Sequence, residues 1–339
     1  MNSIRFLQLL TVVTMLFAGN AASAREWHIN NNNRMPADFP DINAAMASED
    51  VIEGDTLYIG AGCVISSNQT ISKKVTVIGT GWGYSDSPVA PAKINGHLYI
   101  SGAGTRVLGL YVNGDIQPRA NDIVIERCRF SSVSNWRVNT YLYNVKILSS
   151  YLNRIHANVD YTKYNMGWQV IGNIIVCNSD DGACYALNNA LVENNVIIYK
   201  YNDKAFYYGV DCVIRNNIII NTFAPDAILY GDYGCRFYDN VVSAASGYDG
   251  NTMLGNSVLT DIFNCTGSVG SGEYYSLKEG SPAIAAGEGG IDCGVMVGAY
   301  KFVPYGRPQY IPVIKEAVVP AMPTDGRVKV SFKIENQND

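Results

Sequence analysis

The chain has 339 residues and a net charge of −5 at neutral pH, with only 16% charged residues and 23 tyrosines. A protein that binds nucleic acid needs a basic surface to neutralise phosphates, so this charge balance argues against DNA or RNA as a partner. The same balance makes a strongly anionic polysaccharide a harder ligand, unless a cation or a local basic patch mediates the contact.

Residues 1–24 have the pattern of a secretory signal peptide. Arg5 supplies the positive start, residues 6–18 form an apolar run, and Ala22-Ser23-Ala24 is a small-residue cleavage site. The apolar run is too short to span a bilayer, which disfavours the alternative of a membrane anchor, and no other apolar stretch is long enough to cross a membrane. We therefore expect an exported protein that is periplasmic, extracellular or on the cell surface.

Residues 41–50 (DINAAMASED) predict a short helix near the start of the mature chain. Asp41 can cap it, and Ile42, Ala45 and Met46 share one face. The strand expected at residues 54–62 (GDTLYIGAG) follows directly. A protein made of stacked coils exposes the apolar end of its core, so we expect this helix to form an N-terminal cap.

Residues 122–242 contain one short unit written six times. The copies are DIVIERCRF, NVKILSSYL, WQVIGNIIV, ALVENNVII, CVIRNNIII and CRFYDNVV. Aligning them places Cys128, Ser150, Asn173, Asn195, Asn217 and Asn240 at one position. A fixed period in the twenties predicts a solenoid in which each repeat is one coil.

The columns of this alignment predict two strands in each coil, because apolar and other residues alternate with the period of a strand. The position three before the ladder holds Ile125, Ile147, Val170, Val192, Ile214 and Phe237, and the position two after it holds Phe130, Leu152, Ile175, Ile197, Ile219 and Val242. Both columns are apolar, so both are expected to point inward. The intervening column is mixed and is expected to face outward: Glu126, Leu148, Ile171, Glu193, Arg215 and Tyr238.

The ladder position lies at a sharp bend between these two strands. Asn tolerates the left-handed backbone that such a bend requires, and stacked Asn side chains can hydrogen-bond along the stack. A third strand is expected to begin at Ala183, Ala205 and Ala227. Each coil is therefore predicted to contain three strands with an Asn bend between two of them.

This pattern resembles the right-handed parallel β-helix family, which has the pectate-lyase-like fold and an asparagine ladder. The resemblance implies an all-β, single-stranded right-handed parallel β-helix over residues 25–303, with the short N-terminal capping helix. It also implies a polysaccharide partner, although lyases, hydrolases, epimerases and non-catalytic adhesins share the architecture. Residues 277–300 resemble the closing segment of such proteins and are expected to tie off the last coil. Residues 304–339 are expected to form a Pro-rich extended segment that ends in a strand.

The eight cysteines leave two interpretations open. Cys212 and Cys235 share an apolar column, where they are either buried small hydrophobic residues or a bridge between coils. The pairs better placed for loop bridges are Cys177 with Cys184 and Cys265 with Cys293. The chain has no C-x-x-C pair, which argues against a zinc site.

An acidic loop recurs at the coil period and contains Asp180, Asp181, Asp203 and Asp226. Stacked coils lie about 4.8 Å apart, so these carboxylates are expected to gather along one edge. The resemblance implies calcium bound by acids in such loops, with Asp180 and Asp181 as the candidate ligands. The alternative is that these Asp residues only form turns.

The strand beside this loop is expected to present Lys163, Tyr185, Tyr207 and Leu229 outward. A tyrosine stripe suits sugar rings, because an aromatic plane can pack against the apolar face of a sugar and the hydroxyl can hydrogen-bond. The alternative is that stacked rings only stabilise the parallel strands. If the protein is an enzyme, the candidate catalytic residues are Lys163, Asp203 and Lys204, with a lysine as base next to a carboxylate.

Two functions remain open at this stage. The first is a polysaccharide lyase or glycosidase acting in the tyrosine-lined groove. The second is a non-catalytic glycan-binding or structural module at the cell surface or in the periplasm. The G-H-G and R-I-K motifs of the polygalacturonases and the Arg-x-x-Arg motif of the pectate lyases are missing from the sequence, which counts against both of those activities.

Overall fold

The computed structural model describes residues 24–32, 35–83, 90–134, 141–157, 166–180, 182–202, 204–231, 233–255, 259–264, 275–307, 313–318 and 330–335. The predicted signal segment before residue 24 lies outside these ranges. So do the candidate site residues Lys163, Asp181 and Asp203, and the cysteine Cys265.

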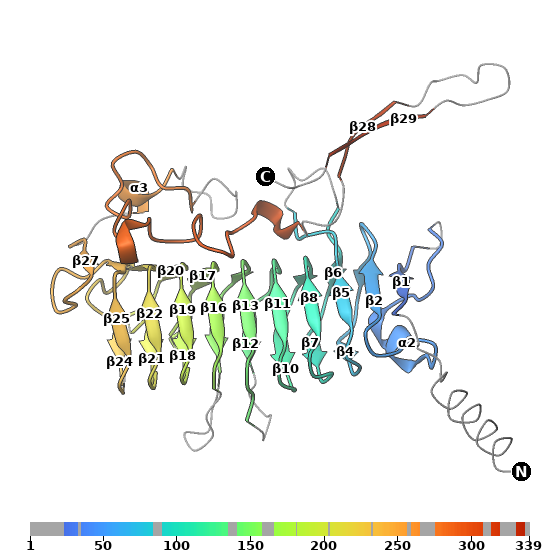
Figure 1. Cartoon of the computed structure of the whole chain (residues 1–339), viewed down its shortest axis with the longest axis horizontal. Helices are drawn as coiled ribbons and strands as arrows, with labels where there is room; N and C mark the ends of the chain where they lie inside the picture. Colours follow the sequence, from blue (N-terminus) through green and yellow to red (C-terminus); the bar gives the residue numbers. More distant parts are fainter. Residues whose placement is uncertain are drawn as a thin grey trace, which may run out of the picture.

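The described chain forms a right-handed parallel β-solenoid, as the sequence predicts. Successive coils stack along one long axis (Figure 1). Sheet A contains β1 (Glu26–Ile29), β2 (Thr56–Ile59), β5 (Thr76–Ile78), β8 (Arg106–Leu108), β11 (Val124–Glu126), β13 (Lys146–Leu148), β16 (Gln169–Ile171), β19 (Leu191–Glu193), β22 (Val213–Arg215) and β25 (Arg236–Tyr238).

Two further faces complete each coil. Sheet B contains β3 (Val64–Ile65), β6 (Lys93–Ile94) and β9 (Tyr111–Val112), followed by β14 (Tyr151–Leu152), β17 (Ile174–Cys177), β20 (Val196–Tyr199), β23 (Ile218–Asn221), β26 (Val241–Val242) and β27 (Thr252–Met253). Sheet C contains β4 (Gln69–Ile71), β7 (Leu98–Ile100), β10 (Ile116–Pro118), β12 (Ser132–Ser134), β15 (Arg154–His156), β18 (Cys184–Tyr185), β21 (Phe206–Tyr207) and β24 (Leu229–Tyr230).

The first end of the solenoid is covered by helix α2 (Ile42–Ala47). The Asp41 carboxylate accepts the Ala44 N–H at 2.8 Å, and Ile42, Ala45 and Met46 are buried as predicted. The sequence pattern did not predict β1. This strand pairs with β2, which was expected to be the first strand of the solenoid.

Asp55, next to β2, fixes β1 in place. Its carboxylate accepts the backbone N–H groups of Arg25 at 2.8 Å and Ile52 at 2.9 Å, and the Trp27 Nε1–H at 2.7 Å. Burial disfavours the ionised carboxylate, but these hydrogen bonds outweigh burial and hold the pKa of Asp55 below its ordinary value.

The predicted asparagine ladder is present between sheets A and B. From Ser150 to Asn217, each member donates its backbone N–H to the side chain of the next at 2.8–3.0 Å, and Asn173, Asn195, Asn217 and Asn240 are fully buried. Asn251 adds one more member, since its Oδ1 accepts the Asn240 N–H at 3.0 Å. The inward columns predicted from the alignment share the register of the strands and form the core.

The left-handed backbone lies one residue earlier than expected. The ladder Asn residues have ordinary φ values, and the residue before each ladder position has a positive φ instead: Gly109, Arg127, Ser149, Gly172, Asn194, Asn216 and Asp239. The left-handed residue is common to all these bends. The side-chain amide follows it in the coils that carry Asn173, Asn195, Asn217 and Asn240, where it hydrogen-bonds from coil to coil.

The C-terminal segment does not close the last coil as expected. Residues 283–307, here called the strap, run back along the outside of the solenoid (Figure 1). The Glu288 N–H donates to Asn216 Oδ1 at 2.8 Å, Ser149 Oγ donates to the Tyr300 carbonyl at 3.0 Å, and Arg127 Nη1 donates to the Arg307 carbonyl at 2.9 Å.

The strap gives the solenoid a second apolar layer. The outer sides of β17, β20 and β23 pack with Val295 and Phe302 of the strap in one buried cluster. The column expected to face outward is not all exposed, since its members Glu126, Leu148 and Ile171 are buried. The described C-terminal elements also include α3 (Leu259–Ile262), η2 (Glu288–Gly290), η3 (Pro304–Gly306) and the antiparallel pair β28 (Val313–Val318) and β29 (Ser331–Glu335).

Two residues of that column form an ion pair. Arg215 Nε lies 3.2 Å from Glu193 Oε1 on the adjacent coil, as the 22-residue spacing predicts. The strap adds a second acid, since Arg215 Nη1 also pairs with Glu288.

We expect the Glu193–Arg215 pair to contribute at most about 1 kcal/mol to the free energy of unfolding, because both side chains are partly exposed to water. A double-mutant cycle with Glu193→Gln and Arg215→Gln measures this coupling by urea denaturation, with the Glu288–Arg215 cycle as its reference. A coupling of several kcal/mol would show that the pair is far less solvated than its exposure indicates.

The expected loop disulfides do not form. Cys184 and Cys293 carry free thiols. Cys184 points into the core instead of toward the loop, and the thiol of Cys293, itself a strap residue, donates to the Asp239 carbonyl of the solenoid at 3.3 Å. Burial raises the pKa of Cys293 to about 12, so the protonated thiol predominates near neutral pH.

Candidate functional site

The outward face of sheet C carries a column of aromatic residues. Strand pairing aligns His156 with Tyr185, Tyr185 with Tyr207, and Tyr207 with Tyr230. Leu229, expected in this column, pairs with Phe206 instead. The coil that ends at Asn240 is one residue longer than the coil before it, and a slip of one residue moves a strand's side chains to the opposite face.

Ring contacts join this column into one surface over three consecutive coils. The ring centroids of Tyr185 and Tyr207 are 6.2 Å apart, and those of Tyr207 and Tyr230 are 5.4 Å apart. Tyr208 was not predicted, yet its ring lies 5.6 Å from Tyr185, 5.8 Å from Tyr207 and 5.7 Å from Tyr230. We call Tyr185, Tyr207, Tyr208 and Tyr230 the tyrosine cluster.

Tyr208 has an unfavourable backbone conformation. Its φ is 53°, in the left-handed region, where a bulky side chain costs about 1–3 kcal/mol. Gly231 lies at the matching position of the next coil, and a Cβ there would be only 3.0 Å from the Tyr208 ring. The fold therefore leaves space for this ring and holds it against its three neighbours.

The cluster is a surface and not part of the core. The Tyr230 side chain is 52% exposed, and Tyr185, Tyr207 and Tyr208 are half-buried. His156 closes one end of the column: its ring is buried and lies edge-on to Tyr185, with 4.6 Å between the centroids. The four tyrosine rings therefore lie at the protein surface.

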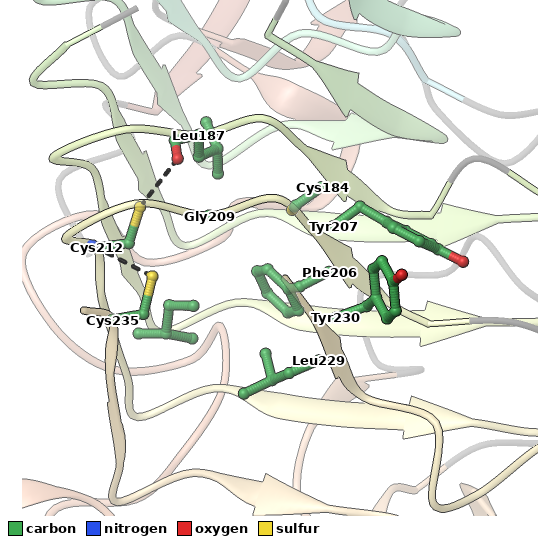
Figure 2. Close-up of a pocket in the computed structure, with 10 residues that line it drawn as sticks. Cys184, Leu187, Phe206, Tyr207, Gly209, Cys212, Leu229, Tyr230 and Cys235 are labelled. Atoms are coloured by element: carbon green, nitrogen blue, oxygen red, sulfur yellow. Dashed lines mark hydrogen bonds between the residues drawn. The ribbon is translucent and has the colours of Figure 1, made fainter. Parts of the chain in front are cut away.

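A small apolar pocket lies beneath Tyr207 and Tyr230 (Figure 2). Its volume is about 10 Å³, room for about one water molecule. A sugar ring cannot enter such a space. A carbohydrate ligand must therefore lie on the outer faces of the tyrosine rings.

Of the four acidic loop residues, the structure describes Asp180 and Asp226. Asp180 is exposed in its loop, and the Asp226 carboxylate accepts the Ala245 N–H of a later loop at 2.9 Å. Within the described ranges, no group of three His, Cys, Asp or Glu side chains is arranged to hold a metal ion. Calcium takes six to eight oxygen ligands, so these residues alone do not form its site, and the contribution of Asp181 stays a prediction.

Of the three candidate catalytic residues, the structure describes only Lys204. It is half-buried and lies two residues before the start of β21, which carries Tyr207. Gly182 packs against both: a Cβ there would lie 2.9 Å from the Tyr207 ring and 3.1 Å from the Lys204 carbonyl oxygen. Lys204 therefore borders the tyrosine cluster, and the roles of Lys163 and Asp203 stay predictions.

The sequence contains a signal for the cluster members that the sequence analysis did not predict. The dipeptide Tyr207-Tyr208 and the fragment Leu229-Tyr230-Gly231 both end a strand in a turn. Aligning Tyr207 with Tyr230 instead of Leu229 would have extended the stripe by one coil. The left-handed conformation of Tyr208 has a signal too, since Gly231 occupies the matching position of the next coil and Gly is typical of left-handed positions.

No helix within the described part of the chain is long and apolar enough to cross a membrane. No protein-family model matches the chain, and no curated protein matches its sequence.

Proposed function

We propose that this protein binds a polysaccharide whose sugar rings pack on the tyrosine cluster of sheet C. The observation that carries the proposal is the continuous surface of Tyr185, Tyr207, Tyr208 and Tyr230 across three coils. Aromatic planes pack against the apolar faces of sugars, and phenol groups at the edge can hydrogen-bond to sugar hydroxyls. The predicted signal peptide supports export to a place where such polymers occur.

The position of the Tyr208 ring favours ligand binding over simple strand stabilisation. Rings stacked in one column are enough to stabilise the parallel strands. Tyr208 lies after the end of β21, outside that column, and Gly231 leaves room for its ring. A ring outside the column widens the aromatic surface that a sugar can contact.

Binding is proposed ahead of catalysis because the described residues form a surface for packing, not a set of acid and base groups. A lyase or glycosidase acting at the same place would need a proton acceptor beside the cluster. Lys204 borders the cluster, and Lys163 and Asp203 remain the other candidates. The predicted bound calcium would be required only if the ligand carries carboxylates.

Replacing two rings of the cluster should weaken glycan binding. We expect Tyr207→Ala combined with Tyr230→Ala to lose about 1–3 kcal/mol of binding free energy, because each stacked ring contributes about 0.5–1.5 kcal/mol. Isothermal titration calorimetry against polygalacturonate, alginate, glycosaminoglycans and a neutral glucan, with and without calcium, measures this loss.

Tyr58→Ala is the matched control, since that half-exposed ring stacks on His28 in sheet A, away from the cluster. It should leave the affinity unchanged. Equal affinity of the double variant and the parent for the best ligand would place the site elsewhere. If no glycan binds and no unsaturated product absorbs in the ultraviolet with calcium present, the structural-module alternative is favoured.

A further inference from the structure

Two cysteines on adjacent coils lie at the edge of the pocket beneath the tyrosine cluster. Cys212 directly precedes β22 and Cys235 directly precedes β25, and these two strands pair in register. The Cys212 N–H points at Cys235 Sγ, 3.4 Å away, and the Arg236 N–H donates to the Cys212 carbonyl at 2.8 Å. Figure 2 shows the two side chains one above the other on the same side of the pocket.

The spacing of these residues suits a covalent bridge. Neighbouring parallel strands are about 4.8 Å apart, and disulfides join Cα atoms that are about 4.4–6.8 Å apart. Gly209 leaves the space around the sulfurs open: a Cβ there would lie 3.1 Å from Cys235 Sγ and 4.0 Å from Cys212 Sγ. Both sulfurs therefore lie beside the same space next to Gly209, which no described side chain fills.

The two thiols differ in access to solvent. Cys212 is buried, and its thiol donates to the Leu187 carbonyl at 3.4 Å. The contact with the Cys235 sulfur and its own burial both raise the pKa of Cys212. Cys235 is half-buried, so it is the thiol that an external oxidant meets first.

We propose that Cys212 and Cys235 are a dithiol that closes to a disulfide between coils when the protein meets a disulfide oxidant. The Cys235 thiolate attacks one sulfur of the oxidant and releases one thiol. The Cys212 thiolate then attacks Cys235 Sγ in the mixed disulfide and releases the second thiol. Two protein thiols are oxidised and one oxidant disulfide is reduced, so electrons and protons balance.

The disulfide joins the coil that carries Tyr207 and Tyr208 to the coil that carries Tyr230. It therefore fixes the relative position of two parts of the tyrosine cluster. Such a bond is expected to persist in an oxidising compartment, which fits the predicted export. The inference does not rely on glycan binding, because its test measures thiols alone.

The test uses the full chain, reduced and then exposed to oxidised glutathione. Thiols that remain are alkylated under denaturing conditions, and unreduced peptides are mapped by mass spectrometry. We expect the parent to lose two alkylatable thiols and to yield a linked peptide pair containing Cys212 and Cys235. Cys63→Ala, in a distant early coil, should still lose two thiols, whereas Cys235→Ser and Cys212→Ala should not form the linked pair.

Three outcomes would overturn the proposal. Both thiols could stay fully alkylatable after oxidation, or Cys235 could remain as a mixed disulfide with glutathione. Alternatively, either cysteine could be recovered linked to a different partner such as Cys184. Since the parent chain provides the main measurement, a variant that fails to fold does not decide the result.

Discussion

Asn195→Leu is expected to lower the free energy of unfolding by about 2–6 kcal/mol, because it leaves two buried backbone groups without partners at about 1–3 kcal/mol each. Asn195 Oδ1 accepts the Asn173 N–H at 2.8 Å, and Asn195 Nδ2 donates to the Val170 carbonyl at 2.8 Å. The size of the leucine side chain is not the cause of this loss of stability, since Leu110 occupies the matching position of an earlier coil and is fully buried. Urea denaturation monitored by circular dichroism measures the change.

The same substitution at an exposed site is the control. Asn178 lies in a loop after β17 and is exposed, so Asn178→Leu should change stability by no more than about 0.5 kcal/mol. If Asn195→Leu were equally mild, the backbone groups around the bend would have to find water or other partners. That result would contradict the role assigned to the ladder.

Gly172→Ala is expected to lower the free energy of unfolding by about 2–5 kcal/mol and to loosen the strap. Gly172 has a φ of 68°, and a Cβ there would lie 1.9 Å from the Tyr300 carbonyl oxygen. The added methyl group must push Tyr300 away from Ser149 Oγ, which donates to that carbonyl at 3.0 Å. Urea denaturation measures the stability, and limited proteolysis measures how readily the strap is cut.

Gly167→Ala separates backbone strain from the strap contact. Its φ is 69°, almost the same, but a Cβ there meets nothing within 4 Å. It should cost only the left-handed strain, about 1 kcal/mol, with no change in proteolysis of the strap. Equal effects of the two variants would mean that the strap does not press on the coil at Gly172.

Sequence alone predicted the features that repeat in every coil. The ladder, the inward columns and the Glu193–Arg215 pair follow from a period of 22 or 23 residues, because stacking places equivalent positions side by side. The capping helix followed from a local pattern of Asp41 and three apolar residues. Each of these features is determined within one coil or between a coil and its neighbour.

The sequence also indicates that the solenoid has an outer cover, although the repeat pattern alone does not predict the strap. The strands β17, β20 and β23 read IIVC, VIIY and IIIN, with every residue buried. A strand that is apolar on both faces is covered on both faces. The sequence alone therefore indicates that a cover exists, but only the tertiary structure shows that residues 283–307 provide it.

Strand register and one local backbone conformation determine which tyrosines form the cluster. An additional residue between Asn217 and Asn240 moves Tyr230, in place of Leu229, into the outward column. Tyr208 joins the cluster because its backbone is left-handed and Gly231 makes room for the ring. The period of the chain determines which coils are neighbours. An inserted residue and a left-handed turn determine which side chains of neighbouring coils come into contact. These contacts depend on the packing of the whole stack.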